Sequence, residues 1–228
     1  MFAECAASVL AQTFTDWTWW VVINEWTWPI RYSNIDSWDT IFNDPRIVTL
    51  WFPTDTHLRE EVHVPARIVN WLYPKVITPY IYFLADDDLI DPDGLDVLVE
   101  AASSEDWDTH NVWAKHNAVY GRCEVVDEQP DGSYTHATWC YEHGDVGLDT
   151  AIDPHCLLDG GQVLHTKALW DRAVADGWQL SDALDHAPAN DGLLLSRLAK
   201  FARFHYVPQR IVTHRRHAGA THHRPVNP

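Results

Sequence analysis

The stretch from Tyr80 to Gly94, YIYFLADDDLIDPDG, constrains the fold of this chain more than any other. Its first five residues, Tyr80 to Leu84, are apolar and rich in β-forming side chains, which predicts a strand covered by helices on both faces. Three carboxylates follow at once, Asp86, Asp87 and Asp88. Ligands bind at the carboxyl ends of strands in open α/β sheets, and like charges repel, so a divalent cation is the simplest partner for this cluster.

Two other interpretations of the acidic cluster stay open. One is a solvated acidic turn before a helix that begins with Pro92, with Asp91 as its cap. The other is a calcium loop with Asp93 and Glu100 among its ligands, although Leu89 would then fill the first ligand position. The apolar strand before the cluster and the helix after it favour a ligand site.

Helices and strands alternate in the first half of the chain. We expect helices at Phe2 to Thr13, Asn34 to Asn43, Ala66 to Lys75 and Pro92 to Ala102, and strands at Asp16 to Asn24, Arg46 to Phe52 and Tyr80 to Leu84. This alternation is typical of a parallel sheet with right-handed crossovers. With 228 residues, the chain is expected to form a single α/β domain.

The pattern changes after residue 110. Strand-like runs separated by turn residues predict a small antiparallel insertion, at Val112 to Val119, Arg122 to Val126 and Tyr134 to Tyr141. The rest predicts strands at Gln162 to His165, Phe204 to Val207 and Ile211 to Thr213, and helices at Lys167 to Ala175 and Asp191 to Ala202. The tail from His214 to Pro228 has no apolar periodicity.

The net charge of −17 argues against a general nucleic-acid-binding protein. Residues 192–228 contain no Asp or Glu and hold seven of the sixteen basic residues, so the rest of the chain carries nine basic residues against thirty-three acidic ones. An acidic body that binds a cation and a basic segment that binds phosphate would complement each other at a metal–diphosphate site.

Neither an 18-residue apolar span nor a signal-peptide pattern is present, so we expect no transmembrane segment and a cytoplasmic location. The four cysteines, Cys5, Cys123, Cys140 and Cys156, form no C-x-x-C pair. We interpret them as reduced core thiols.

Five separated stretches, in the same order, resemble the GT-A glycosyltransferases of the family 2 type, which transfer a sugar from a nucleotide diphosphate with inversion. These stretches are SVLAQTFTDWTWWVV from Ser8, DPRIVTL from Asp44, YIYFLADDDLIDPDGL from Tyr80, VYGRCEVVDEQPDG from Val119 and the segment from Asn190 to His222, which ends in HRRHAGATH. The resemblance implies a Rossmann-like, mostly parallel sheet flanked by helices, with the antiparallel insertion. It also implies a nucleotide-sugar-binding half at residues 1–110, an acceptor-side half at 111–213 and a basic, histidine-bearing tail at 214–228 over the active site.

The resemblance implies a metal site of the DXD type. Asp87 matches the metal-binding carboxylate, Asp88 is a second candidate ligand, and His217 matches a C-terminal histidine that completes the metal shell. Asp86 matches a carboxylate that contacts ribose. Carboxylates with a neutral imidazole suit Mn²⁺, whereas Mg²⁺ would use more oxygen ligands and water. The alternative for His217 is an exposed tail histidine.

The same resemblance implies the remaining roles. Asp191 matches the general base that takes the proton from the acceptor hydroxyl, with helix capping as the alternative. Asp159 and Gly160 match a loop near the donor sugar, with a tight turn as the alternative. Candidate diphosphate ligands are Arg67, Arg215 and Arg216.

Two features depart from the family pattern. The family's first strand precedes the first helix, but Met1 falls inside that region. Either the strands at residues 17–24 and 79–85 close the gap, another segment or chain fills it, or the protein begins upstream of Met1. The second strand ends in Asn24-Glu25-Trp26 where the family has Asp-Asp-Gly-Ser. Glu25 is therefore our candidate for the base-contacting acid, and Trp26 or Trp28 could stack on the base.

The sequence thus predicts a metal-dependent inverting glycosyltransferase that uses a nucleotide-sugar donor, with a UDP-sugar favoured. The acceptor is left open among a glycan, a lipid carrier, a protein and a modified nucleobase, and an oligomer is compatible with the sequence. The alternatives are a nucleotide- or glycan-binding member of the fold without turnover, and a metal-dependent phosphohydrolase or nucleotidyltransferase.

Overall fold

The computed structural model describes residues 1–24, 41–52, 63–104, 118–140, 144–155, 157–183 and 190–217. The chain divides into two compact units. The larger comprises Met1–Thr13, Val76–Trp178 and Pro188–Pro228, and the smaller comprises Phe14–Lys75 and Gln179–Ala187.

The smaller unit contains two parallel strands and a helix. Strand β1 (Trp19–Ile23) pairs with β2 (Ile47–Trp51), both within the predicted runs of aromatic and β-branched residues. Helix α3 (Val64–Leu72) continues into the 3₁₀ helix η2 (Tyr73–Lys75). The helix begins before the expected Ala66 because proline is tolerated in the first turn, where no backbone donor is needed. The helix expected from Asn34 lies almost entirely outside the described residues.

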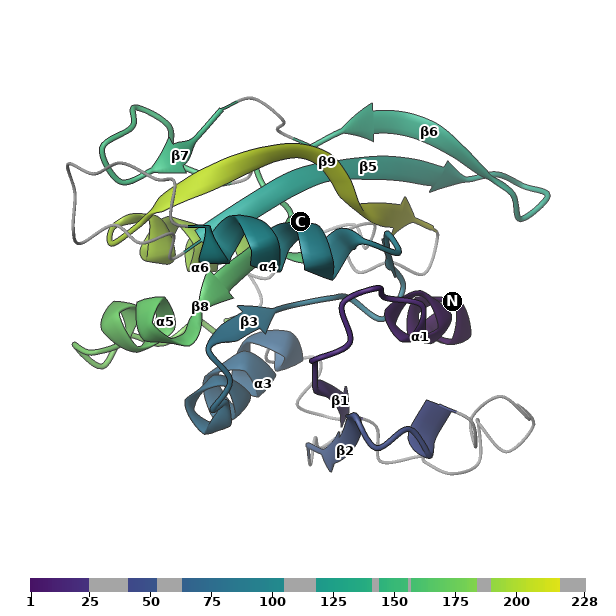
Figure 1. Cartoon of the computed structure of the whole chain (residues 1–228), viewed down its shortest axis with the longest axis horizontal. Coiled ribbons are helices and arrows are strands. Elements are labelled where there is room, and N and C mark those ends of the chain that lie inside the picture. The colour runs from purple at the N-terminus through teal and green to yellow at the C-terminus, as the bar shows by residue number, and fades with distance from the viewer. Residues whose placement is uncertain are drawn as a thin grey trace. The chain divides into compact units, whose positions relative to one another are not determined.

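The larger unit is built on a mixed sheet in the order β3-β8-β5-β9-β4, with β6 paired to β5 and β7 to β9 (Figure 1). Its strands are β3 (Tyr80–Tyr82), β4 (Leu89–Ile90), β5 (Ala118–Glu128), β6 (Tyr134–Trp139), β7 (Val146–Gly147), β8 (Val163–Thr166) and β9 (Arg203–Arg216). The pairing of β5 with β9 is parallel, whereas the other pairings in this sheet are antiparallel.

The helices of the larger unit are α1 (Phe2–Leu10), α4 (Gly94–Ser103), α5 (Lys167–Ala173) and α6 (Asn190–Ala199), with the 3₁₀ helix η3 at Gly160–Gln162. Helix α4 lies along β5 and β9 (Figure 1) and buries Leu98 against Val119, Leu164 and Ile211. Within the described residues, no helix combines the length and the apolar character needed to cross a lipid bilayer.

Two long strands replace four shorter expected ones. The runs expected to end at Val119 and restart at Arg122 form one strand, β5, and the expected residues before Ala118 lie outside the described part of the chain. The two strands expected after Phe204 likewise form one strand, β9, which continues to Arg216 instead of ending at Thr213. Side-by-side pairing between β5 and β9 sustains both strands across the breaks that their sequences suggest.

The acidic stretch also differs in detail from the expectation. Strand β3 covers three residues rather than five, and a second short strand, β4, follows the carboxylates. The N-cap residue of helix α4 is Asp93, not Asp91, and its side chain makes no capping hydrogen bond. Asp91 instead binds Arg210 through its carboxylate, and its carbonyl accepts a hydrogen bond from Gly94.

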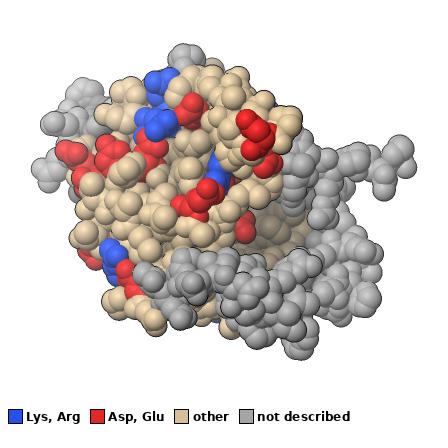
Figure 2. All heavy atoms as spheres, turned by 90° about the vertical axis from the view of Figure 1, so that its right-hand side faces the viewer, with Lys and Arg blue, Asp and Glu red and all other residues tan. Residues whose placement is uncertain are grey.

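Most basic side chains of the C-terminal segment bind acidic side chains of the same unit. The ion pairs are Arg197 with Asp176, Arg210 with Asp91 and Glu124, Arg215 with Glu4, and Arg216 with Asp127, at N–O distances of 2.6 to 2.8 Å. On the face in Figure 2, the basic residues lie next to acidic ones.

Candidate functional site

A short turn between β3 and β4 carries the three carboxylates. Asp86 and Asp87 form the turn, and Asp88 directly precedes β4. Because β4 pairs antiparallel with β9, with Leu89 opposite Thr213, the residues that follow Thr213 run directly past the carboxylates. This pairing brings together residues 127 positions apart in the sequence.

Asp87 and His217 face each other at this turn. His217 Nε2 lies 3.0 Å from Asp87 Oδ2. The His217 side chain is 8% exposed and that of Asp87 is 25% exposed, so the pair is open to solvent mainly on the carboxylate side. The Asp87 carboxylate oxygen and the His217 imidazole nitrogen are thus in contact with each other near the surface of the turn.

Asp88 is buried and binds two groups of β9. Its Oδ1 accepts a hydrogen bond from the backbone N–H of Arg215 at 3.0 Å, and its Oδ2 lies 3.2 Å from His214 Nδ1. A buried carboxylate requires such partners, because an unpaired buried charge is strongly unfavourable. Asp88 therefore fixes the turn to the strand.

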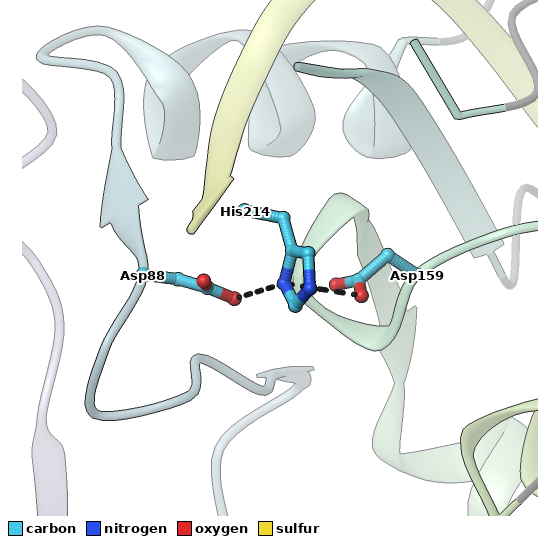
Figure 3. A group of neighbouring side chains, drawn as sticks. All are labelled: Asp88, Asp159 and His214. Atoms are coloured by element: carbon cyan, nitrogen blue, oxygen red, sulfur yellow. Dashed lines mark hydrogen bonds and ion pairs between the residues drawn. The ribbon is translucent and has the colours of Figure 1, made fainter. Parts of the chain in front are cut away.

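His214 lies between Asp88 and Asp159 (Figure 3). Its Nδ1 is 3.7 Å from Asp159 Oδ2, and the three residues could supply a metal ion with one ligand atom each. Burial lowers the pKa of His214, but the hydrogen bond to Asp88 and the charges of Asp88 and Asp159 outweigh it and raise the pKa to about 9. In its protonated form the imidazole acts as an ion pair that joins the two carboxylates, and a bound metal ion would take the place of its proton.

Asp159 begins a tight turn that reaches the predicted base. Its Oδ1 accepts a hydrogen bond from Gly161 N at 2.7 Å, and Gln162 completes the capping box. The Tyr82 hydroxyl donates to the carbonyl oxygen of Gly161, which ties the turn to β3. A Cβ atom at Gly160 would lie 3.1 Å from Oδ2 of Asp191, and one at Gly161 would lie 3.9 Å from Oδ2 of Asp88.

Asp191 lies in the first turn of α6 and is exposed. The backbone N–H groups of a helix N-terminus favour the ionised carboxylate there. The turn from Asp159 to Gly161 thus has the Asp191 carboxylate on one side and Asp88 on the other.

The other predicted site residues are more scattered. Asp86 is the most exposed carboxylate of its turn, and desolvation on its protein side followed by the charge of Asp87 raises its pKa. Arg216 binds Asp127. In the smaller unit, Arg67 pairs with Asp182 at 3.0 Å. Glu25 lies outside the described residues, as do Trp26 and Trp28.

Arg215 has its guanidinium inside the protein. Nη1 donates to Oε2 of Glu4 at 2.6 Å, Nη2 donates to the Met1 carbonyl at 3.3 Å, and Nε donates to the carbonyl of Asp87. The residue is 3% exposed. Arg215 and Arg216 therefore do not act side by side, because successive side chains of a strand point to opposite faces.

The sequence reasoning missed His214. The signal lies in β9, which continues past Thr213, where the apolar run of the sequence ends. Continuing the strand by three residues would have placed His214 beside the turn that carries Asp88.

The chain matches no family model and no curated protein by sequence. Its structure is similar to that of TarS from S. aureus, with a TM-score of 0.59 and 13% identity over 94% of this chain and 34% of the TarS chain. Structures of TarS 1–349 in complex with UDP and with UDP-GlcNAc give TM-scores of 0.60 and 0.61 at 12% identity. These matches cover 94% and 96% of this chain and 56% of that one, so this chain spans less than two thirds of either TarS chain.

This similarity shows the fold. The chain shares its fold with TarS, and the expected class of an α/β sheet flanked by helices is confirmed.

Proposed function

We propose that this protein is a glycosyltransferase that moves a hexosyl or related sugar from a nucleotide-diphosphate donor to an acceptor hydroxyl with inversion. The fold supports this proposal, and so do the complexes of the structurally similar TarS with UDP and UDP-GlcNAc, which favour a UDP-sugar as donor. The candidate acceptors are still a glycan, a lipid carrier, a protein or a modified nucleobase.

One observation carries the proposal. The turn from Asp159 to Gly161 lies between the acidic turn and Asp191, and its two glycines have no side chain where a Cβ atom would approach the carboxylates of Asp191 and Asp88. Sugar transfer needs a base on one side of the anomeric carbon and charge stabilisation of the leaving diphosphate on the other. An arrangement of two acidic groups flanking one small turn fits this need.

Asp87 and His217 fit a divalent cation. Ligand atoms at about 2.1 Å from an octahedral ion, in neighbouring positions, lie about 3.0 Å apart. Asp87 Oδ2 and His217 Nε2 are separated by 3.0 Å. The mixed oxygen and nitrogen donors suit Mn²⁺. Asp88 has both oxygens engaged with β9, so in our proposal it holds the turn in place while Asp87 and His217 bind the ion.

The bound cation would neutralise charge on the diphosphate. Asp191 takes the proton from the acceptor hydroxyl, whose oxygen forms a bond to the anomeric carbon as the bond to the nucleotide diphosphate breaks. Asp159 and Gly160 are proposed to border the donor sugar. For the nucleotide we propose Asp86 at the ribose, Glu25 at the base, and Arg67 and Arg216 at the diphosphate.

Donor binding and donor turnover test the proposal separately. UDP-, GDP- and TDP-sugars are assayed for hydrolysis and transfer, with Mn²⁺ and with EDTA. We expect Asp191→Asn to retain donor binding and lose turnover by at least about 100-fold. Asp171→Asn, an exposed helical aspartate outside the site, serves as the matched control. Donor binding without turnover in the parent protein would instead identify a non-catalytic binding protein, and cleavage of nucleotides that carry no sugar would identify a phosphohydrolase.

A further inference from the structure

We propose that Arg215 is a positioning residue that holds Asp87 and Asp88 in the geometry needed for cation binding, and that it does not contact the donor. This inference rests on the proposed function, because it assumes the cation at Asp87 and His217.

The guanidinium of Arg215 is fully committed to its own protein. Each of its three nitrogens donates a hydrogen bond, Nε to the Asp87 carbonyl, Nη1 to Glu4 and Nη2 to the Met1 carbonyl. One face of the guanidinium lies 5.6 Å from the ring centroid of Tyr134. With 3% of the residue exposed, a diphosphate cannot reach the remaining donors without displacing α1 or the acidic turn.

Arg215 binds the acidic turn from two directions. Its backbone N–H holds the carboxylate of Asp88, and its side chain holds the backbone of Asp87. The backbone of Asp87 is thereby fixed, while its carboxylate faces His217. His217 is only two residues further along the chain, so Arg215 controls the position of both proposed ligands.

The charge of Arg215 has a second effect. Three neighbouring carboxylates repel one another, and the buried guanidinium adds a positive charge at their turn beside that of His214. Glu4 shares this charge, since the hydrogen bond from Arg215 lowers the pKa of Glu4. Partners that orient metal ligands typically contribute about 10- to 100-fold to metal affinity.

The test measures Mn²⁺ affinity by the free-ion electron paramagnetic resonance signal, and UDP affinity in EDTA by calorimetry. The full chain is compared with Arg215→Met, Arg215→Lys and Arg210→Met. Arg210 is the matched control, because it lies on the same strand and also binds two carboxylates, Asp91 and Glu124, away from the turn. Circular dichroism and thermal unfolding establish that each variant is folded.

We expect Arg215→Met to weaken Mn²⁺ binding by about 10- to 100-fold while UDP affinity in EDTA stays within about twofold. Arg215→Lys keeps the positive charge but cannot donate to all three acceptors of the guanidinium. We therefore expect its Mn²⁺ affinity to lie between those of Arg215→Met and the parent protein. Arg210→Met is expected to match the parent in both measurements. If Arg215→Met does not fold, Arg215→Lys decides, with an expected loss of about fivefold or more.

Two results would overturn the inference alone. One is unchanged Mn²⁺ affinity in the folded Arg215 variants, and the other is a loss of metal-free UDP affinity, which would place the guanidinium on the diphosphate. A parent protein that binds no Mn²⁺ would overturn both this inference and the metal site of the proposed function.

Discussion

Adding one methyl group at Gly160 should impair catalysis without unfolding the protein. In Gly160→Ala, the new Cβ would lie 3.1 Å from Oδ2 and 3.4 Å from Cγ of Asp191, and 3.5 Å from Cδ1 of Phe83. The backbone at Gly160 is not left-handed, so alanine introduces no conformational strain. The substitution therefore acts mainly on the position of the Asp191 carboxylate.

The size of the effect follows from the contact distances. Relief of the 3.1 Å contact requires the carboxylate to move by a few tenths of an ångström, and a displacement of about 1 Å can cost about 100-fold in rate. We therefore expect kcat to fall by about 4- to 10-fold. The free energy of unfolding should change by less than about 1 kcal/mol, because alanine also restricts the unfolded chain.

Initial rates of nucleotide release at saturating donor measure this effect. The control is Gly177→Ala, where the positive φ of 83° strains any alanine but no atom lies within 4 Å. We expect that control to lose about 1 kcal/mol of stability and to keep its kcat. A folded Gly160→Ala protein with the kcat of the parent would refute the assignment of Asp191 as the base at this turn.

Three further predictions concern stability and thiol chemistry. A Cβ at Gly121 would lie 2.1 Å from Cγ1 of Ile211, so Gly121→Ala should destabilise the β5–β9 pairing by about 1–3 kcal/mol in urea unfolding. Burial lowers the pKa of His165 to about 4, so the unfolded chain binds a proton at a higher pH than the folded protein does. The free energy of unfolding is therefore unaffected by His165 above about pH 6.5 and decreases as the pH falls toward 4. Unfolding followed across this window should show a loss of up to about 3 kcal/mol that His165→Gln reduces. The hydrogen bond from Cys123 lowers the pKa of the partly exposed Cys140, so peptide mapping after brief iodoacetamide treatment should find Cys140 alkylated before Cys123, and equal labelling would contradict this order.

Local sequence patterns were sufficient to predict most elements of the fold. The strands β1 and β2 and the helix α5 lie within the predicted runs, because aromatic and β-branched residues or a capped apolar stripe specify them locally. Local sequence patterns did not predict that β9 is one continuous strand. Between Tyr206 and Arg210, which pair with Tyr120 and Arg122, β9 has three residues opposite the single Gly121, and Pro208 occupies this bulge. Proline, which lacks an N–H, is tolerated at such a bulge, but only the pairing partner reveals it.

The candidate site shows the same division between what local sequence patterns indicate and what depends on tertiary contacts. The carboxylates after a buried strand and the resemblance pointed to Asp87 and His217, which do meet. The direction of the Arg215 side chain depends on where β9 ends and on what packs against it. Both are set by the pairing of β9 with β4 and by α1, which are tertiary features.

The charge asymmetry of the sequence has a different meaning in the folded chain. The basic C-terminal segment was expected to bind phosphate, yet four of its seven basic residues bind carboxylates of the larger unit: Arg197, Arg210, Arg215 and Arg216. The exposed pairs among them, such as Arg216 with Asp127, contribute about 0–1 kcal/mol each, so their main effect is to cancel charge locally. Arginines that are already paired with carboxylates interact less favourably with a diphosphate. Neutralisation of the leaving group must then depend more on the cation proposed at Asp87 and His217, which is why we expect turnover to be lost in EDTA and restored by Mn²⁺.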